Sequence, residues 1–143
     1  KMLEIMQSCD CCRIGLKDKD SVYILPLNFG YEEKSGKLTL YFHGASEGKK
    51  IDLIKQQNTA SFEMDTKHQL VEADVACSYS YLYQSIMGKG KISLVDDPEE
   101  KINGLECVML HYSNNNTWKF NEEVLKRVAV IKIEVTEWSC KEH

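Results

Sequence analysis

The residues with the clearest chemical potential lie at positions 41–54, where an apolar strand gives way to small residues and then to a cationic helix. The first N–H groups of a helix have no partner within it and carry the positive end of its dipole, so an anion is favoured there. Lys49 and Lys50 add two whole positive charges, and the backbone at Gly44 and Gly48 can be approached closely. The stretch therefore predicts a phosphate site.

Two other interpretations centre on Ser46. As an N-cap it would make this an ordinary helix start with its lysines in solvent, although lysines in a first turn oppose the dipole. Ser46 and Lys49 also match the S-x-x-K pattern of serine acyl-enzymes, but the S-D-N and K-T-G motifs that accompany that pattern are missing.

His43 differs from the other histidines because it ends a strand beside these small residues. An imidazole there could donate a hydrogen bond or a proton to a ligand, which makes His43 the candidate catalytic residue; the alternative is a structural histidine. Pro26, in an earlier extended run, cannot donate to a strand ladder and so marks an edge or a bulge. Backbone groups near Asn28 are then expected to be free for a ligand.

Composition excludes several classes of function. The 143 residues indicate one domain, 1–143, and a net charge of −4 argues against a nucleic-acid or anionic-membrane surface. No apolar run is long enough to span a membrane and no signal peptide is evident, so we expect a cytoplasmic protein. The six cysteines lack the spacing of a zinc site, so we expect reduced thiols and no metal.

The periodicity indicates a mainly β protein of the α+β class, with about six strands and a few helices. A regular alternation of strands and helices is missing, so a small antiparallel barrel is favoured over a doubly wound sheet. The expected strands are 22–31 and 37–43, which form a hairpin, then 59–65, 77–95 with a bend at its glycines, and 128–135. The expected helices begin near Glu47, follow the acidic cap and proline at 96–98, and span 121–127.

Taken in order, several short motifs give the chain a family resemblance. They lie at residues 12–16, 23–31, 41–50 and 85–90. The chain resembles the flavin-binding split-barrel proteins related to pyridoxamine phosphate oxidase and, among them, the nitroimidazole resistance branch. This resemblance implies a six-stranded antiparallel split β-barrel with a few flanking helices, which forms a homodimer and holds FMN between its two protomers.

The resemblance also implies roles for individual residues. Lys49 and Lys50 are expected on the FMN phosphate, and Tyr83 and Ser85 are expected to contact the flavin across the dimer, with Trp118 as a further aromatic contact. The other expected cofactor-binding residues flank the ring or the phosphate: Pro26, Leu27, Asn28, Phe29, His43, Gly44, Ala45 and Ser46. The ending at 135–140 departs from the Thr-Gly-Lys of relatives, so the final cleft-facing residues are not carried over.

The function implied is an FMN-dependent reductase of small planar acceptors such as nitroimidazoles, with NADH or NADPH as electron donor. The alternative is a non-catalytic flavin carrier or sensor, because fold analogy alone does not separate the two. An oxidase acting on pyridoxamine phosphate would need a second phosphate site built from arginines. The chain contains only Arg13 and Arg127, which argues against it.

Overall fold

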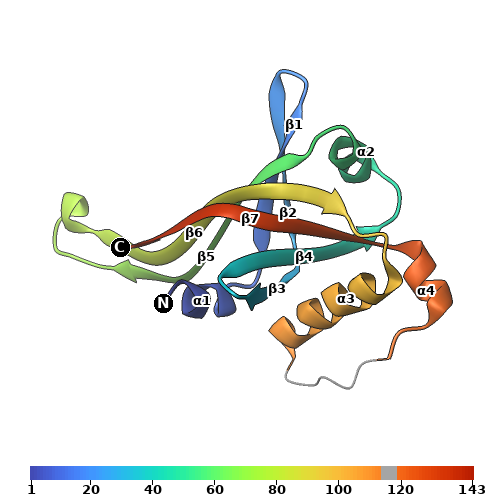
Figure 1. Cartoon of the computed structure of the whole chain (residues 1–143). Helices are drawn as coiled ribbons and strands as arrows, with labels where there is room; N and C mark the ends of the chain where they lie inside the picture. The colour runs from blue at the N-terminus through green and yellow to red at the C-terminus, as the bar shows by residue number, and fades with distance from the viewer. Residues whose placement is uncertain (114–118) are drawn as a thin grey trace.

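A single antiparallel sheet of seven strands forms the body of the computed structural model, which describes residues 1–113 and 119–143 (Figure 1). Across the sheet the strand order is β2-β1-β5-β6-β7-β4-β3. The strands are β1 (Cys12–Asp18), β2 (Ser21–Leu27), β3 (Phe29–Lys34), β4 (Lys37–Ala45), β5 (Thr59–Val71), β6 (Ser80–Leu94) and β7 (Val128–Glu142).

Short helices surround the sheet. They are α1 (Met2–Gln7), α2 (Lys49–Lys55), the 3-10 turn η1 (Ala76–Ser78), α3 (Pro98–Tyr112) and α4 (Glu122–Arg127). As the sequence predicts, α3 begins with a proline and is capped by Asp97, whose carboxylate accepts a hydrogen bond from the amide of Glu100 at 3.1 Å. Among the described residues, no helix combines the length and the apolar character that crossing a membrane requires.

The connection between β2 and β3 curls the sheet into a barrel whose two edge strands are not joined by a ladder. These strands occupy opposite edges of the sheet, yet Asn28 alone joins them. Six inter-strand gaps of ~4.8 Å would separate the edges of a flat sheet by ~29 Å, whereas one residue spans at most ~3.6 Å. The sheet must therefore curl until its edges meet, which confirms the split-barrel prediction.

The number of strands differs from the six that were expected. The predicted run 22–31 is interrupted at Asn28, where the chain changes pairing partners and so becomes β2 and β3. Its second half forms the expected hairpin with β4, whereas its first half pairs with β1, a strand the periodicity did not reveal.

Two apolar clusters hold the elements together. The larger fills the barrel, and α1 and α2 contribute Ile5, Met6, Ile51, Leu53 and Ile54 to it. The smaller lies between α3, α4 and the outer side of β4 and β7, and comprises Tyr41, Val95, Leu105, Val108, Leu125 and Val130. Because α2 is fixed by buried side chains, the position of its first turn is set by the core.

An arm extends from the body where β5 and β6 continue beyond their neighbours, with η1 at its tip (Figure 1). The two chain ends lie together near the base of this arm, and Lys1 forms an ion pair with Glu142 there.

We predict that Gly30→Ala destabilises the fold, because a Cβ at this position would overlap the α3 backbone at Cys107 and Val108. Overpacking against backbone costs ~1–3 kcal/mol of unfolding free energy. Gly15→Ala is the control, since a Cβ there would meet Val22 Cγ1 at an ordinary 3.4 Å. Chemical denaturation of both variants checks this, and equal stability of the two would contradict the close approach of α3 to β3.

Candidate functional site

The strand ladder opens where β2 and β4 diverge. Phe29 and Phe42 are the last pair of the β3–β4 ladder, and one step further Asn28 would face His43. Instead β2 pairs with β1, while β4 continues along β7. The backbone edges of residues 26–28 and 43–45 that face each other therefore have no strand partner among the described residues. We call these two segments the ladder opening.

His43 stands at this opening with an exposed side chain. Tyr41, two residues earlier on the same face of β4, is buried beneath α3 and donates a hydrogen bond to Glu100 at 3.1 Å. Burial and this carboxylate raise the pKa of Tyr41 far above its usual range. His43, unlike Tyr41, is not buried beneath α3. Its imidazole has no hydrogen-bond partner within residues 1–113 and 119–143, so it is available to a ligand.

Two lysines at the start of α2 lie beside the diverging strands, Lys50 over Gly44 of β4 and Lys49 over Tyr23 of β2, three residues before Pro26. Lys49 Nζ lies 2.9 Å from Asp18 Oδ2 and 4.8 Å from the centre of the Tyr23 ring of β2. Hydrogen bonding to Asp18 raises the pKa of Lys49. Lys50 crosses Gly44 of β4 so closely that a Cβ there would lie 2.9 Å from its Cε. Glycine at position 44 therefore makes room for the Lys50 side chain.

Ser46 and Ala45 are exposed beside these lysines. The interpretation of Ser46 as the cap of α2 is wrong, because the N-cap is Gly48, with φ of 130°, and no side chain caps this helix. A positive φ of this size suits glycine, which places the helix start two residues later than a serine cap would. Among the residues that the structure describes, the first-turn amides of α2 thus have no side-chain cap.

Tyr112, the last residue of α3, holds the backbone at one end of the opening. Its hydroxyl accepts hydrogen bonds from the Phe29 amide at 3.2 Å and the Asn28 side chain at 3.4 Å, and donates one to the Asp10 carbonyl at 2.5 Å. The Phe29 amide is therefore not free for a ligand, contrary to expectation. The Phe29 side chain is fully buried, and the centre of its ring lies 4.4 Å from the centre of the His111 ring. Phe29 therefore packs in the core beside the opening.

Tyr83 and Ser85 lie far from the opening of the same chain. Ser85 pairs with Lys141 near one end of β7, whereas His43 pairs with Val130 near the other end. At ~3.3 Å per residue, Val130 and Lys141 are ~35 Å apart along β7, and so are the residues that pair with them. Trp118 lies outside the described residues. One chain therefore brings together His43, Gly44, Lys49, Lys50 and residues 26–28, but not Tyr83 and Ser85.

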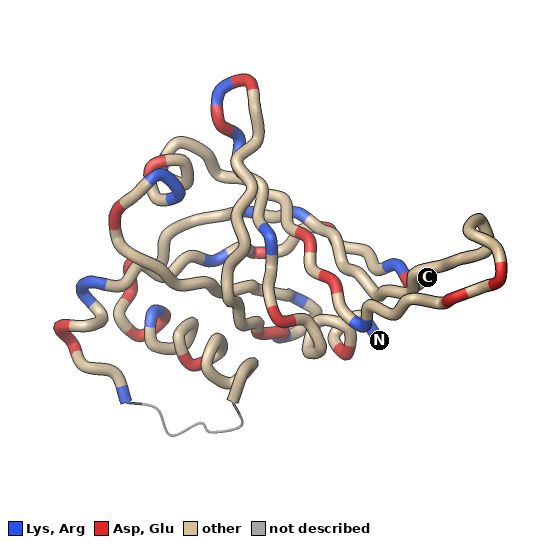
Figure 2. The backbone as a smooth tube through the Cα atoms, turned by 180° about the vertical axis from the view of Figure 1, so that it is seen from behind, with Lys and Arg blue, Asp and Glu red and all other residues tan. Residues whose placement is uncertain are grey.

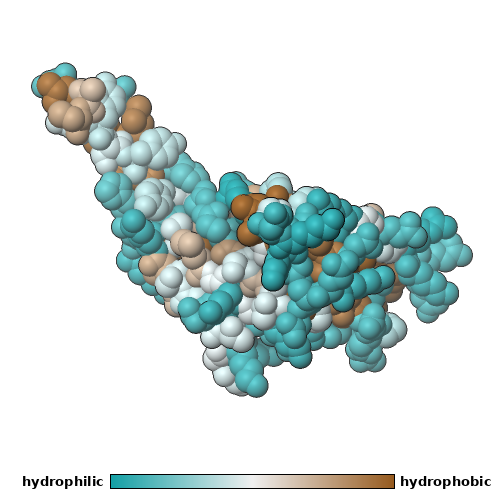
Figure 3. Space-filling model, turned by 90° about the horizontal axis from the view of Figure 1, so that it is seen from above, coloured by the Kyte–Doolittle hydropathy of each residue, from teal (hydrophilic) through white to brown (hydrophobic). Residues whose placement is uncertain are grey.

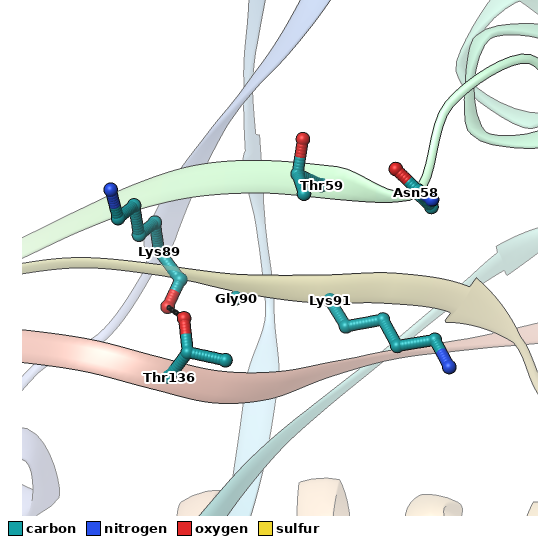
Figure 4. Close-up of a pocket in the computed structure, with 6 residues that line it drawn as sticks. All are labelled: Asn58, Thr59, Lys89, Gly90, Lys91 and Thr136. Atoms are coloured by element: carbon teal, nitrogen blue, oxygen red, sulfur yellow. Dashed lines mark hydrogen bonds between the residues drawn. The ribbon is translucent and has the colours of Figure 1, made fainter.

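One surface hollow lies away from the opening. It has a volume of about 430 Å³ and is on the outer side of β5, β6 and β7. Figure 4 shows that its two lysine side chains point away from each other, so they do not converge on one anion. Its lining residues are Asn58, Thr59, Lys89, Gly90, Lys91 and Thr136.

Charged residues of both signs are interspersed along the chain, including the turn between β1 and β2 (Figure 2). Within the described part of the chain, no three His, Cys, Asp or Glu side chains are placed to hold a metal ion. All six cysteines are free thiols, and burial raises the pKa of Cys9 to about 12.

Comparison with known proteins gives a match over almost the whole chain. The family model for pyridoxamine 5′-phosphate oxidase matches residues 1–142. A candidate 5-nitroimidazole antibiotic resistance protein from Bacteroides thetaiotaomicron is similar in structure, with a TM-score of 0.83 and 32% identity, over 96% of this chain and 80% of that chain.

Two more distant structures share the fold. An FAD- and heme-binding protein from Mycobacterium smegmatis has a TM-score of 0.81 and 15% identity, over 96% of this chain and 67% of that chain. The flavocytochrome Anf3 from Azotobacter vinelandii has a TM-score of 0.79 and 19% identity, over 99% of this chain and 65% of that chain. No curated protein sequence matches significantly.

Proposed function

The chain belongs to the pyridoxamine 5′-phosphate oxidase family, and we propose that it binds a flavin, specifically FMN, at the ladder opening. The observation that carries this proposal is the pair of lysines beside the two diverging strands, Lys49 over Tyr23 of β2 and Lys50 over Gly44 of β4. The names of the two more distant structures, which describe a flavocytochrome and an FAD- and heme-binding protein, agree with a flavin ligand.

The chemistry of the opening fits such a ligand. Two ammonium groups suit a phosphate, and each charge-assisted contact is worth ~1.5–3 kcal/mol. Lys49 would exchange the Asp18 carboxylate for the phosphate, at little cost because an exposed ion pair contributes little to stability. The unpaired backbone edges of residues 26–28 and 43–45 supply donors and acceptors for the polar edge of a flat ring system.

The binding site is completed, in this proposal, by a second copy of the chain. Tyr83 and Ser85 are ~35 Å from the opening along the strand, too far to reach the same ligand. In a homodimer they would approach the FMN of the partner, with Trp118 as a further aromatic contact. Each protomer would then hold the phosphate of one FMN and cover the ring of the other.

We further propose that the protein is an oxidoreductase that takes electrons from NADH or NADPH and reduces a small planar acceptor such as a nitroimidazole, in line with the name of the Bacteroides protein. A bound flavin supplies the electron transfer itself, while the protein orients the reactants. The exposed imidazole of His43 would hold a proton, or donate a hydrogen bond, at the acceptor.

Particular contacts bear on two alternatives to the proposed reductase function. A flavin carrier or sensor is favoured by the lack of a described partner that would orient His43, because general acids are usually held in position. Oxidation of pyridoxamine phosphate is disfavoured, because Arg13 is engaged by Glu63 at 2.9 Å and by Asp65 at 3.0 Å. The other arginine of the chain is Arg127, at the end of α4, so a second phosphate site could not be built from several arginines.

We predict that Lys49→Ala/Lys50→Ala weakens FMN binding and leaves riboflavin binding unchanged, because riboflavin lacks the phosphate. Loss of two contacts of ~1.5–3 kcal/mol each corresponds to a decrease of more than 100-fold in FMN affinity. Lys55→Ala, an exposed lysine in the last turn of the same helix, is the matched control. Fluorescence titration measures both ligands, and unchanged preference for FMN in the double variant would refute the phosphate assignment.

We predict that His43→Ala keeps FMN bound and slows the reaction. A general acid contributes ~10²–10⁴-fold to a rate, whereas removal of an exposed side chain has little effect on stability. Single-turnover reduction of a nitroaromatic by prereduced protein, without oxygen and normalised to bound flavin, measures the effect. Equal rates for the variant and the unmodified protein would support the carrier function instead.

A further inference from the structure

The C-terminal end of α3 reaches the ladder opening because this helix packs closely on β3. Gly30 allows the approach, since a Cβ there would overlap the α3 backbone at Cys107. His111 and Tyr112 follow about one helical turn later on the same side of α3. Both side chains contact Phe29, the first residue of β3, and so lie where the chain leaves β2.

These two side chains also hold the segment between α1 and β1. The His111 ring lies 4.4 Å from the Phe29 ring and 4.7 Å from the Tyr112 ring, measured between centres. Its Nε2 lies 2.7 Å from the carbonyl oxygen of Cys9, and since a carbonyl only accepts, this nitrogen is the one that donates. The Tyr112 hydroxyl donates to the next carbonyl, that of Asp10, at 2.5 Å. These contacts fix the position of the Tyr112 hydroxyl.

The hydrogen bonds of the Tyr112 hydroxyl decide how the Asn28 side chain is turned. A phenol has one hydrogen to donate, and the Asp10 carbonyl takes it. The two other partners of the hydroxyl must therefore be donors, and they are the Phe29 amide at 3.2 Å and the Asn28 side chain at 3.4 Å. The NH₂ group of Asn28 thus faces Tyr112, and its carbonyl oxygen stands on the other arm of the amide.

The side-chain oxygen of Asn28 is available to accept a hydrogen bond at the opening. Asn28 is exposed, and this oxygen has no hydrogen-bond partner within residues 1–113 and 119–143. The neighbouring Phe29 amide, which could have donated to a ligand, is occupied by Tyr112. The Asn28 side chain therefore presents an acceptor here, which suits a ligand that carries an N–H group.

Tyr112 stands apart from the main group of exposed apolar side chains. Five of that group lie on the arm, whose tip is visibly apolar in Figure 3: Leu70, Val71, Val75, Tyr79 and Tyr81. The helix α3 lies away from the arm (Figure 1), and Tyr112 at its end is 44% exposed. Replacement of Tyr112 by phenylalanine would therefore remove the hydroxyl alone, without opening a cavity in the core.

We propose that Tyr112 is a positioning residue for the ligand of the ladder opening: it holds Asn28 so that the side-chain oxygen accepts a hydrogen bond from a ring N–H. This role rests on the proposed function and names one contact through which that site would select its ligand. The oxidised isoalloxazine ring carries a single N–H, on its imide nitrogen N3, so this group is the donor that the oxygen would meet. Tyr112 acts through Asn28 and need not touch the ring.

Titration of Tyr112→Phe with FMN and with N3-methyl-FMN tests the proposal. The methylated ligand keeps the phosphate but has no ring N–H. Without the hydroxyl the Asn28 amide is free to turn, so we expect FMN to bind ~3–10-fold more weakly, as for the loss of one hydrogen bond. N3-methyl-FMN should bind the variant and the unmodified protein equally. A merely structural role would weaken the binding of both ligands alike.

Tyr31→Phe is the matched control. Tyr31 lies on β3, with its ring centre 5.9 Å from that of His111, and its hydroxyl donates to Gln7 at 2.7 Å. The substitution removes a tyrosine hydroxyl and its hydrogen bond from the same region without touching Asn28, so FMN affinity should not change. Hydrogen exchange of the ligand-free protein adds a second readout. Exchange in a peptide covering residues 26–30 should be faster in Tyr112→Phe than in the unmodified protein.

Three results would overturn the proposal and leave the proposed function standing: unchanged FMN affinity in Tyr112→Phe, an equal loss for N3-methyl-FMN, or unchanged exchange at residues 26–30. Circular dichroism confirms that both variants are folded. A lack of FMN binding by the unmodified protein would instead refute the proposed function, and with it the contact assigned to Asn28.

Discussion

The structure depends on the exchange of pairing partners at Asn28. Before this residue the chain pairs with β1 on one side, and after it with β4 on the other. The exchange brings the two edges of the sheet together, and it also leaves the backbone of β2 and β4 unpaired where they part. Pro26 fits this position because it has no amide hydrogen to leave without a partner. The curling of the sheet and the formation of the opening are thus consequences of one local event.

The core determines where the charges of the opening lie. Ile51, Leu53 and Ile54 anchor α2 in the barrel, and this places Lys49 and Lys50 at its exposed start. Lysines in a first helical turn are unfavourable on their own, since they face the positive end of the helix dipole. Asp18 relieves part of that repulsion for Lys49, and an anionic ligand between the two lysines would relieve it for both. The opening is therefore electrostatically suited to a ligand that is itself an anion.

Local signals in the sequence were sufficient for some elements and misleading for others. Asp97 and Pro98 predicted the start of α3 correctly because capping acts within one helical turn. The six-residue helix α1 was missed because so short a helix is stabilised by burial of Ile5 and Met6 rather than by its own sequence.

The site was harder to predict, because its features join distant segments. The Tyr112 hydroxyl bonds to Phe29 and Asp10 because α3 packs on β3. No local sequence pattern encodes that packing. The separation of Tyr83 from His43 likewise follows from the register of β7 with β6 and β4. The family resemblance supplied Tyr83 and His43 as members of one cofactor site, whereas the fold sets them far apart within one chain, and the proposed homodimer would bring them to one ligand.

Backbone amide hydrogen exchange with and without FMN tests most directly whether the ladder opening is the binding site. The account predicts slower exchange on FMN addition in peptides covering residues 22–30 and 41–50, whose unpaired edges the ligand would engage. Protection confined to the hollow around Lys89 and Lys91, with no change in those two segments, would contradict it.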